Sequence, residues 1–258
     1  MSVSKNSFAS GSGDRKRAQG FFEILFRRSR DKFVHDSRRR GIVIAHGPVT
    51  RLRPLLKNAL IDNVNDLHSL AINHSQSIRA GFLNSQGILK YRKLNQAQRE
   101  RITSSPFGLF LFDSLDQHFN TMRLLLLQAC QHFGYTTHGA HCLGFFHTSR
   151  ANLPRHCDEL DVIVIQLFGK RRWWIERNTH SPDGILDPLR ASSLQSYAVD
   201  PRFGDTTKML ELRPGSVLYV PAGYWHQTYS HAHSFSLTLG LPGPLAALRL
   251  RRRGKGQD

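Results

Sequence analysis

The chain has few cysteines, few acidic residues and no long apolar run. Its three cysteines, Cys130, Cys142 and Cys157, stand at unrelated spacings among 258 residues. This pattern fits neither a disulfide framework nor a thiolate zinc site, so we expect a reducing, cytoplasmic environment. No apolar segment approaches the roughly 18 residues that a membrane-spanning helix needs, and the polar start of the chain has no secretory signal core. We therefore expect no membrane contact.

The shortage of acidic residues leaves a strongly basic chain. There are 36 Lys and Arg residues against 19 Asp and Glu, which gives a formal net charge of +17. Many of the basic residues gather near the ends, in DRKR, FRRSRDK, SRRR and RLRRRGKGQD. Such a distribution favours contact with an anionic partner, such as a ribosome, RNA or an acidic peptide. A solvated basic surface explains the same composition equally well.

Length and composition indicate one globular domain. With 40% hydrophobic residues, the chain can bury a full core. We expect a flexible basic leader over residues 1–20, a folded domain with N-terminal helical elements over 21–242, and a basic tail over 243–258.

Apolar spacing predicts helices early in the chain and short strands later. Helical spacing covers 21–37 and 115–133, where Gly134 is the stop signal, and a short buried strand covers 41–47. Residues 50–105 mix short helical patterns with polar loops. Beyond Gly134, short apolar segments alternate with Gly and Pro turns, and we expect strands at 141–147, 161–168, 171–176, 208–212, 216–220, 224–229 and 234–240. The chain is thus mainly β with flanking helices, as in a small sandwich or barrel.

Three side chains in the second half suggest a metal site. An extended chain sends alternate side chains to one face, so His156 and Asp158 can point together while Cys157 points away. His226 follows a Pro and Gly turn in YVPAGYWHQT. When two histidines and one carboxylate bind one face of a metal, its other coordination positions stay open, as non-haem Fe(II) oxygenases require. Taken singly, a His-x-Asp pair is common and His226 could be an ordinary strand histidine. The order of these motifs along the chain indicates a metal site more specifically than any one of them alone.

These motifs carry a family resemblance. The segments HCDELDVIVIQLFGKRRWW, LRPGSVLYVPAGYWHQT and SFSLTLGL closely resemble the JmjC-type cupin oxygenases, in particular the ribosomal-oxygenase-like and asparaginyl-hydroxylase-like (cupin-4) branch. The segment KFVHDSRRRGIVIAHGP resembles the opening of that branch. The resemblance implies a double-stranded β-helix (cupin or jelly-roll) over about 20–242, with Fe(II), 2-oxoglutarate and O2. His156, Asp158 and His226 would be the iron ligands.

The resemblance also implies a basic residue for the distal carboxylate of 2-oxoglutarate. The family position falls on Arg171, and strand alternation places Arg171, Trp173 and Ile175 on one face. A planar guanidinium suits a carboxylate through paired charge-assisted hydrogen bonds. Lys170 and Arg172 are the alternatives.

Hydroxyl groups would complete the pocket in such an enzyme. Thr148 or Ser149, and Ser236 or Thr238, are the candidates, although each is also explained as an ordinary strand hydroxyl. Tyr224 and Trp225 flank the last ligand, where they either wall the site or pack in the core.

The expected function is hydroxylation of a side chain in a protein or peptide, with possible ribosome association. Three alternatives stay open: the same chemistry on a tRNA nucleoside, the same chemistry on an amino acid or peptide in a biosynthetic pathway, and a non-catalytic cupin that binds nucleic acid. A metal isomerase would bring a richer ligand set. The sequence does not choose between hydroxylation and demethylation. It also leaves the oligomeric state open, because only LPGPLAALRLRRRGKGQD follows the last strand, where several relatives add a dimerisation region.

Overall fold

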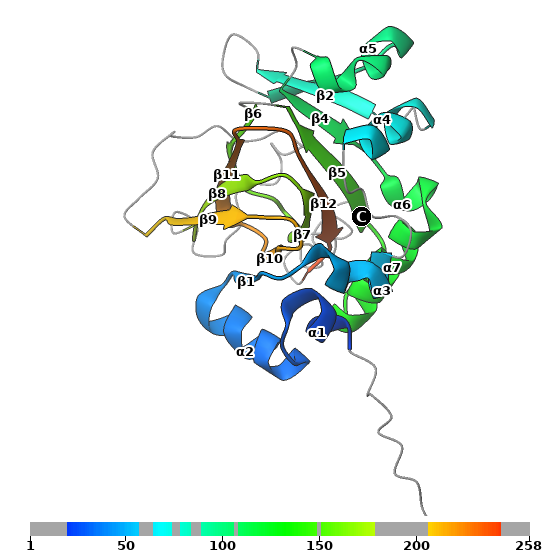
Figure 1. Cartoon of the computed structure of the whole chain (residues 1–258). Coiled ribbons are helices and arrows are strands. Elements are labelled where there is room, and N and C mark those ends of the chain that lie inside the picture. The colour runs from blue at the N-terminus through cyan, green and yellow to red at the C-terminus, as the bar shows by residue number, and fades with distance from the viewer. Residues whose placement is uncertain are drawn as a thin grey trace, which may run out of the picture.

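Two antiparallel β-sheets face each other, and helices cover the outer face of the larger sheet (Figure 1). The computed structural model describes residues 20–56, 64–73, 78–83, 89–105, 108–148, 151–178 and 206–243. The expected leader and the basic tail fall almost wholly outside these residues. Within the described ranges, no helix combines the length and the apolar character needed to cross a bilayer.

The larger sheet has eight strands in the order β1-β10-β7-β12-β5-β4-β2-β3. In that order they are β1 (Val43–Ala45), β10 (Val217–Val220), β7 (Asp161–Phe168), β12 (Ser234–Leu241), β5 (His141–His147), β4 (Leu109–Phe112), β2 (Ile78–Leu83) and β3 (Leu89–Lys93). The smaller sheet has the order β6-β11-β8-β9. Its strands are β6 (Ala151–His156), β11 (Trp225–Ser230), β8 (Arg171–Glu176) and β9 (Lys208–Leu212).

Strands β4, β7, β10 and β12 of the larger sheet are buried on both faces, which explains their continuous apolar runs. In β7, Ile163 and Ile165 pack into the core beneath the helices, whereas Val162 and Val164 pack into a second core between the sheets. The smaller sheet supplies Trp173 to this second core, and its Leu153 packs with Phe145 of the larger sheet in a further apolar cluster of the core between the sheets. The arrangement is the double-stranded β-helix, or jelly roll, that the sequence led us to expect.

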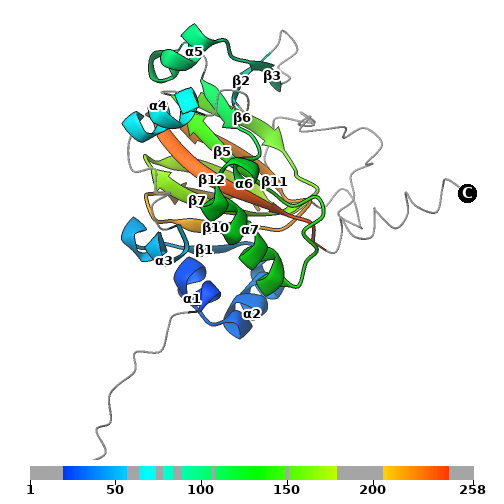
Figure 2. The same ribbon diagram turned by 90° about the vertical axis from the view of Figure 1, so that its right-hand side faces the viewer.

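Helices fill the remaining surface of the larger sheet. Figure 2 shows α6 and α7 crossing in front of its strands, with α1 and α2 at one end and α4 and α5 at the other. The helices are α1 (Phe21–Phe26), α2 (Arg30–Arg40), α3 (Arg53–Leu56), α4 (Val64–Asn73), α5 (Gln96–Glu100), α6 (Leu115–His118) and α7 (Asn120–Phe133), with 3-10 turns at Val49–Leu52 and Ile102–Ser104.

Most predicted strands are confirmed, with bounds that agree to within one or two residues. Both long helices, however, are interrupted. The helix expected over 21–37 is two helices, because Arg27 has a left-handed backbone (φ 55°) and Ser29 caps a new start by accepting from the Lys32 N–H. The helix expected over 115–133 breaks where Phe119 is extended, and Gly134 ends it with φ 73° as expected. The sequence patterns did not predict strands β2, β3, β4 and β6.

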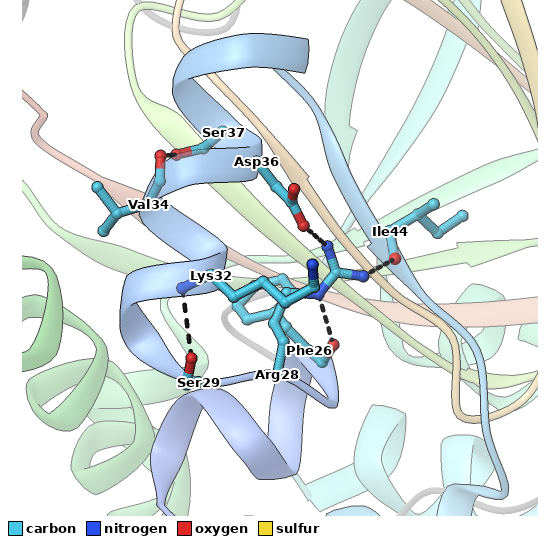
Figure 3. A network of polar contacts seen from close by, with 8 residues as sticks. All are labelled: Phe26, Arg28, Ser29, Lys32, Val34, Asp36, Ser37 and Ile44. Atoms are coloured by element: carbon cyan, nitrogen blue, oxygen red, sulfur yellow. Dashed lines mark hydrogen bonds and ion pairs between the residues drawn. The ribbon is translucent and has the colours of Figure 1, made fainter.

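Arg28 fastens the first two helices to the sheet (Figure 3). Its guanidinium donates to the Phe26 carbonyl at 3.1 Å, to the Ile44 carbonyl at 3.2 Å and to the Asp36 carboxylate at 2.5 Å. The carboxylate side chain is 10% exposed, so water offers it little compensation. One cation thus joins the end of α1, the middle of α2 and strand β1.

We expect Arg28→Leu to lower the free energy of unfolding by about 2 kcal/mol, because it leaves a largely buried carboxylate and two carbonyls without their donor. Urea denaturation followed by circular dichroism measures the loss. The exposed Arg30→Leu is the matched control, and its effect should stay within about 0.5 kcal/mol. Equal effects of both substitutions would contradict this role of Arg28.

Candidate metal centre

His156 and His226 face each other across neighbouring strands. They are paired residues of β6 and β11, and their ring centroids lie 4.1 Å apart. Asp158 follows β6 by two residues, with carboxylate oxygens 3.7 Å from His156 Nε2 and 3.5 Å from His226 Nε2. One ligand atom from each of the three lies within 4.8 Å of the others. Donor atoms about 2.1 Å from one metal at roughly right angles lie about 3 Å apart, so small side-chain shifts would complete coordination.

A β-bulge turns His156 toward the other sheet. Thr228 pairs with Leu153 and His226 pairs with His156, so two residues of β6, Pro154 and Arg155, lie opposite Gln227 alone. Leu153 packs in the core between the sheets. Strict alternation from Leu153 would turn Arg155 inward and His156 outward, and the extra residue reverses this. Pro154 suits the position because it has no N–H to donate to the ladder.

Backbone carbonyls set the orientation of both imidazoles. His156 Nδ1 lies 2.7 Å from the Pro154 carbonyl, and His226 Nδ1 lies 3.1 Å from the Tyr224 carbonyl. Because a carbonyl only accepts, each Nδ1 carries the proton and each Nε2 offers its lone pair. This arrangement is typical of metal-binding histidines. The donor set therefore fits a divalent transition metal.

The turn before β11 fixes the distance between the carboxylate and the second histidine. The Gly223 N–H donates to the Asp158 carbonyl at 2.8 Å, and Gly223 needs its positive φ of 81° for this turn. The neighbouring Ala222 N–H donates to the buried Asp161 carboxylate at 2.8 Å, which also accepts from Tyr135 and Tyr219. The Pro-Ala-Gly turn is thus tied on both sides to the segment that carries Asp158.

Arg171, the position that the family resemblance indicated, lies in the same interior and shares a face of β8 with Trp173. It is 2% exposed and donates to Ser236 Oγ at 2.9 Å and to Thr228 Oγ1 at 2.8 Å. The Trp173 ring lies 5.2 Å from the Arg171 Cζ and 5.5 Å from the His226 ring, so one indole borders both groups. Burial lowers the pKa of Arg171 to about 9, so the side chain is a cation at neutral pH.

No acidic side chain among the described residues forms an ion pair with Arg171, and its Nε has no hydrogen-bond partner there. A buried cation without a counter-ion is costly unless an anion binds beside it. Arg172, one of the alternatives, has a side chain 43% exposed beside Glu211. Lys170, the other, is exposed in the turn. The geometry therefore favours Arg171 as the anion-binding residue.

The structure places the candidate hydroxyl groups differently relative to Arg171. Ser236 contacts Arg171, and Thr238 shares its inward face of β12 without donating to or accepting from Arg171. Thr148 is buried just beyond β5, where its backbone N–H donates to the Gly108 carbonyl. Ser149 lies outside the described residues. Thr228, the second hydroxyl on Arg171, was missed although strand alternation from His226 pointed to it.

Trp225 packs on the outer side of the smaller sheet. The Arg155 guanidinium lies 4.5 Å above its ring and forms a buried ion pair with Glu176. Tyr224 packs beside the core between the sheets, close to Gly41. For these two aromatic residues the structure supports the packing interpretation.

A family model described as the JmjC domain matches residues 114–247, about half of the chain. The chain belongs to the JmjC-domain family. The match includes all three candidate ligands and Arg171.

Curated relatives of this JmjC chain include a ribosomal oxygenase and a ribosomal protein hydroxylase. It is 36% identical over 92 residues to Ribosomal oxygenase 2 of Rattus norvegicus, covering 34% of this chain and 17% of the relative. It is 30% identical over 96 residues to the ribosomal protein uL16 3-hydroxylase of Escherichia coli strain K12, covering 34% and 22%. The matched region thus spans about a fifth of each relative's length.

Solved structures share the JmjC chain's fold. The X-ray structure of E. coli ycfD superposes with a TM-score of 0.54 at 17% identity, covering 87% of this chain and 58% of that one. YcfD, described as a ribosomal oxygenase, in complex with cobalt and 2-oxoglutarate gives 0.53 at 18%, covering 87% and 57%.

Because His226 of the JmjC domain is buried, we expect the metal-free protein to become less stable in acid. Burial, and next the nearby His156, lower the pKa of His226 to about 4. The unfolded chain binds a proton at this residue near pH 6.5, whereas the folded chain does so only near pH 4. The contribution of neutral His226 to the free energy of unfolding is therefore fully present above pH 6.5. It is lost as the pH decreases toward 4, which lowers the free energy of unfolding by about 3 kcal/mol.

Urea unfolding of chelator-treated protein between pH 7.5 and 4 measures this loss. His226→Gln should flatten the pH dependence, whereas His138→Gln, at an exposed histidine, should leave it unchanged. If His226→Gln keeps the full slope, the depressed pKa is wrong.

The ion pair beside Trp225 gives a further prediction. The Arg155 and Glu176 side chains are 9% and 8% exposed. Arg155→Met should lower the free energy of unfolding by about 3 kcal/mol or more, because it removes the counter-ion of a buried carboxylate. The double variant with Glu176→Met should recover much of the loss in the same unfolding assay. A double variant as unstable as the sum of the two single ones would contradict a direct coupling.

Proposed function

We propose that this chain is an Fe(II)- and 2-oxoglutarate-dependent oxygenase that hydroxylates a side chain of a protein, with a ribosomal protein as the first candidate substrate. The observation that carries the proposal is a buried, uncompensated guanidinium in the interior that the three candidate metal ligands share. A metal at the triad and a dicarboxylate between the metal and Arg171 would satisfy both sets of groups at once.

The spacing along β11 supports this assignment. His226 and Thr228 lie two residues apart on one face, a separation of about 6.6 Å, and Arg171 donates to Thr228. A five-carbon dicarboxylic acid has the length to reach from the metal to the guanidinium. Arg171 uses two of its five N–H donors on Ser236 and Thr228, which leaves others for a carboxylate.

The residues divide the work. His156, Asp158 and His226 would hold iron on one face and leave the opposite face open for co-substrate and O2. Bound iron with 2-oxoglutarate would supply the oxidising chemistry: one oxygen atom of O2 would enter succinate as the keto acid loses CO2, and the other would enter a C–H bond of the substrate. Arg171, with Ser236 and Thr228, orients the keto acid, and Trp173 excludes water beside it.

The relatives and the charge support the proposed substrate class and location. The relatives named above are a ribosomal oxygenase and a ribosomal protein hydroxylase, and a net charge of +17 favours approach to an RNA-rich particle. A cytoplasmic location agrees with this substrate and with three free cysteines.

The test begins with co-substrate binding. Anaerobic addition of Fe(II) and 2-oxoglutarate should produce the weak visible band of an iron–keto acid chelate. Arg171→Gln should weaken 2-oxoglutarate binding by about tenfold to a hundredfold, because it removes a buried charge-assisted contact. Arg172→Gln and Lys170→Gln are matched controls and should change it less than about twofold. If either control weakens 2-oxoglutarate binding as much as Arg171→Gln does, the assignment of the carboxylate contact to Arg171 is contradicted.

Turnover is tested on ribosomal proteins prepared from a strain that lacks the gene. Intact-mass spectrometry should find one added oxygen atom on one protein when iron, 2-oxoglutarate and air are present, and none with Asp158→Ala. Succinate formation without any oxygen-modified protein would remove the assigned substrate class. Absence of both the visible band and succinate would remove the oxygenase assignment.

A further inference from the structure

His147 is a buried histidine that the proposed chemistry has not yet used. It is the last residue of β5 in the larger sheet, where it pairs with Leu109 of β4 and Ser234 of β12. Its exposure is 0%, and neither ring nitrogen has a hydrogen-bond partner among the described residues. A fully buried imidazole without partners costs stability, and such a group in a folded protein calls for a binding partner.

Strand alternation turns His147 toward the interior that contains Arg171. His147 and Phe145 share one face of β5, and Phe145 packs in the core between the two sheets. The Phe145 ring lies 5.6 Å from the Arg171 Cζ. Ser236, which accepts from Arg171, pairs with Phe145, and the next inward residue of β12, Ser234, pairs with His147. His147 and Arg171 therefore reach the same space from opposite sheets.

The electrostatics of this space favour a neutral imidazole. Burial, and next the charge of Arg171, lower the pKa of His147 well below its ordinary value. At neutral pH its ring thus has one N–H donor and one acceptor nitrogen. One guanidinium and one neutral donor match a single carboxylate in charge, whereas a second buried cation would be left uncompensated.

We propose that His147 is a second positioning residue for the co-substrate, donating its imidazole N–H to the same distal carboxylate that Arg171 neutralises. This inference rests on the proposed function, because it takes the bound anion to be the far end of 2-oxoglutarate. The carboxylate would be held from the smaller sheet by Arg171 and from the larger sheet by His147. A carboxylate has enough lone pairs to accept from both.

The contact defines a specificity for the keto acid. A keto acid with the same carbon chain but no distal carboxylate offers His147 nothing to bind. The contribution of His147 should therefore appear with 2-oxoglutarate and vanish with 2-oxopentanoate. A residue that merely supports the fold would affect both keto acids alike.

Isothermal titration of zinc-loaded full-length protein measures this difference without turnover. His147→Leu should weaken 2-oxoglutarate binding by about tenfold and leave 2-oxopentanoate binding within about twofold. His147→Gln, which keeps an N–H donor, should recover part of the affinity for 2-oxoglutarate. His141→Leu, at the other end of β5, is the matched control and should behave as the wild type.

Thermal melting of the metal-free variants separates binding from folding. His147→Leu should melt at the same temperature as the wild type or higher, because it removes a buried polar group that has no partner. Unchanged 2-oxoglutarate affinity in His147→Leu, equal loss for both keto acids, or a large drop in melting temperature would each overturn the role of His147. If zinc-loaded wild-type protein does not bind 2-oxoglutarate, the proposed function itself fails and this inference fails with it.

Discussion

A single extra residue in β6 determines which way the first histidine points. Because Pro154 and Arg155 together lie opposite Gln227, His156 returns to the inward face that Leu153 occupies. Without the bulge, the Arg155 side chain would enter the interior, and the two imidazoles could not face each other across β6 and β11. The bulge also places Arg155 on the outer side, where Glu176 and Trp225 hold it. The arrangement of the metal centre and the packing of the smaller sheet thus depend on one irregularity.

The interior between the sheets combines an apolar core at one end with polar groups that have too few partners at the other. Arg171 and His147 are both buried there, and neither forms an ion pair with a described residue. Such a site lowers the stability of the free protein and raises its affinity for a ligand that supplies the missing charge and acceptors. The apolar neighbours Phe145 and Trp173 strengthen this effect, because they keep water from the guanidinium.

The sequence predicted those parts of the fold that have strong patterns. Strands such as β7 and β12, buried on both faces, have apolar runs that cannot be hidden elsewhere, and their bounds agree with the structure. Strand β6 was missed because ANLPRH contains proline and polar residues, which an edge strand tolerates. The interruptions at Arg27 and Phe119 were missed because the apolar spacing continues through them.

The candidate site was only partly predictable for the same reason. The family resemblance pointed to Arg171, and alternation along β8 agreed with its inward placement, whereas the same alternation applied to β11 would have identified Thr228. His147 could not be found in this way, because its relation to Arg171 depends on how the two sheets stack. Local periodicity contains no information about that stacking, which the packing of Phe145 and Leu153 determines.

The buried carboxylate of Asp161 gives the helical layer a direct connection to the metal centre. Tyr135, just after α7, and the amide of Ala222, in the turn before β11, donate to the same side chain. Displacement of the end of α7 would therefore pull on the loop that sets the position of His226. A partner that docks on the helices would therefore be linked to the candidate metal ligands through only a few hydrogen bonds.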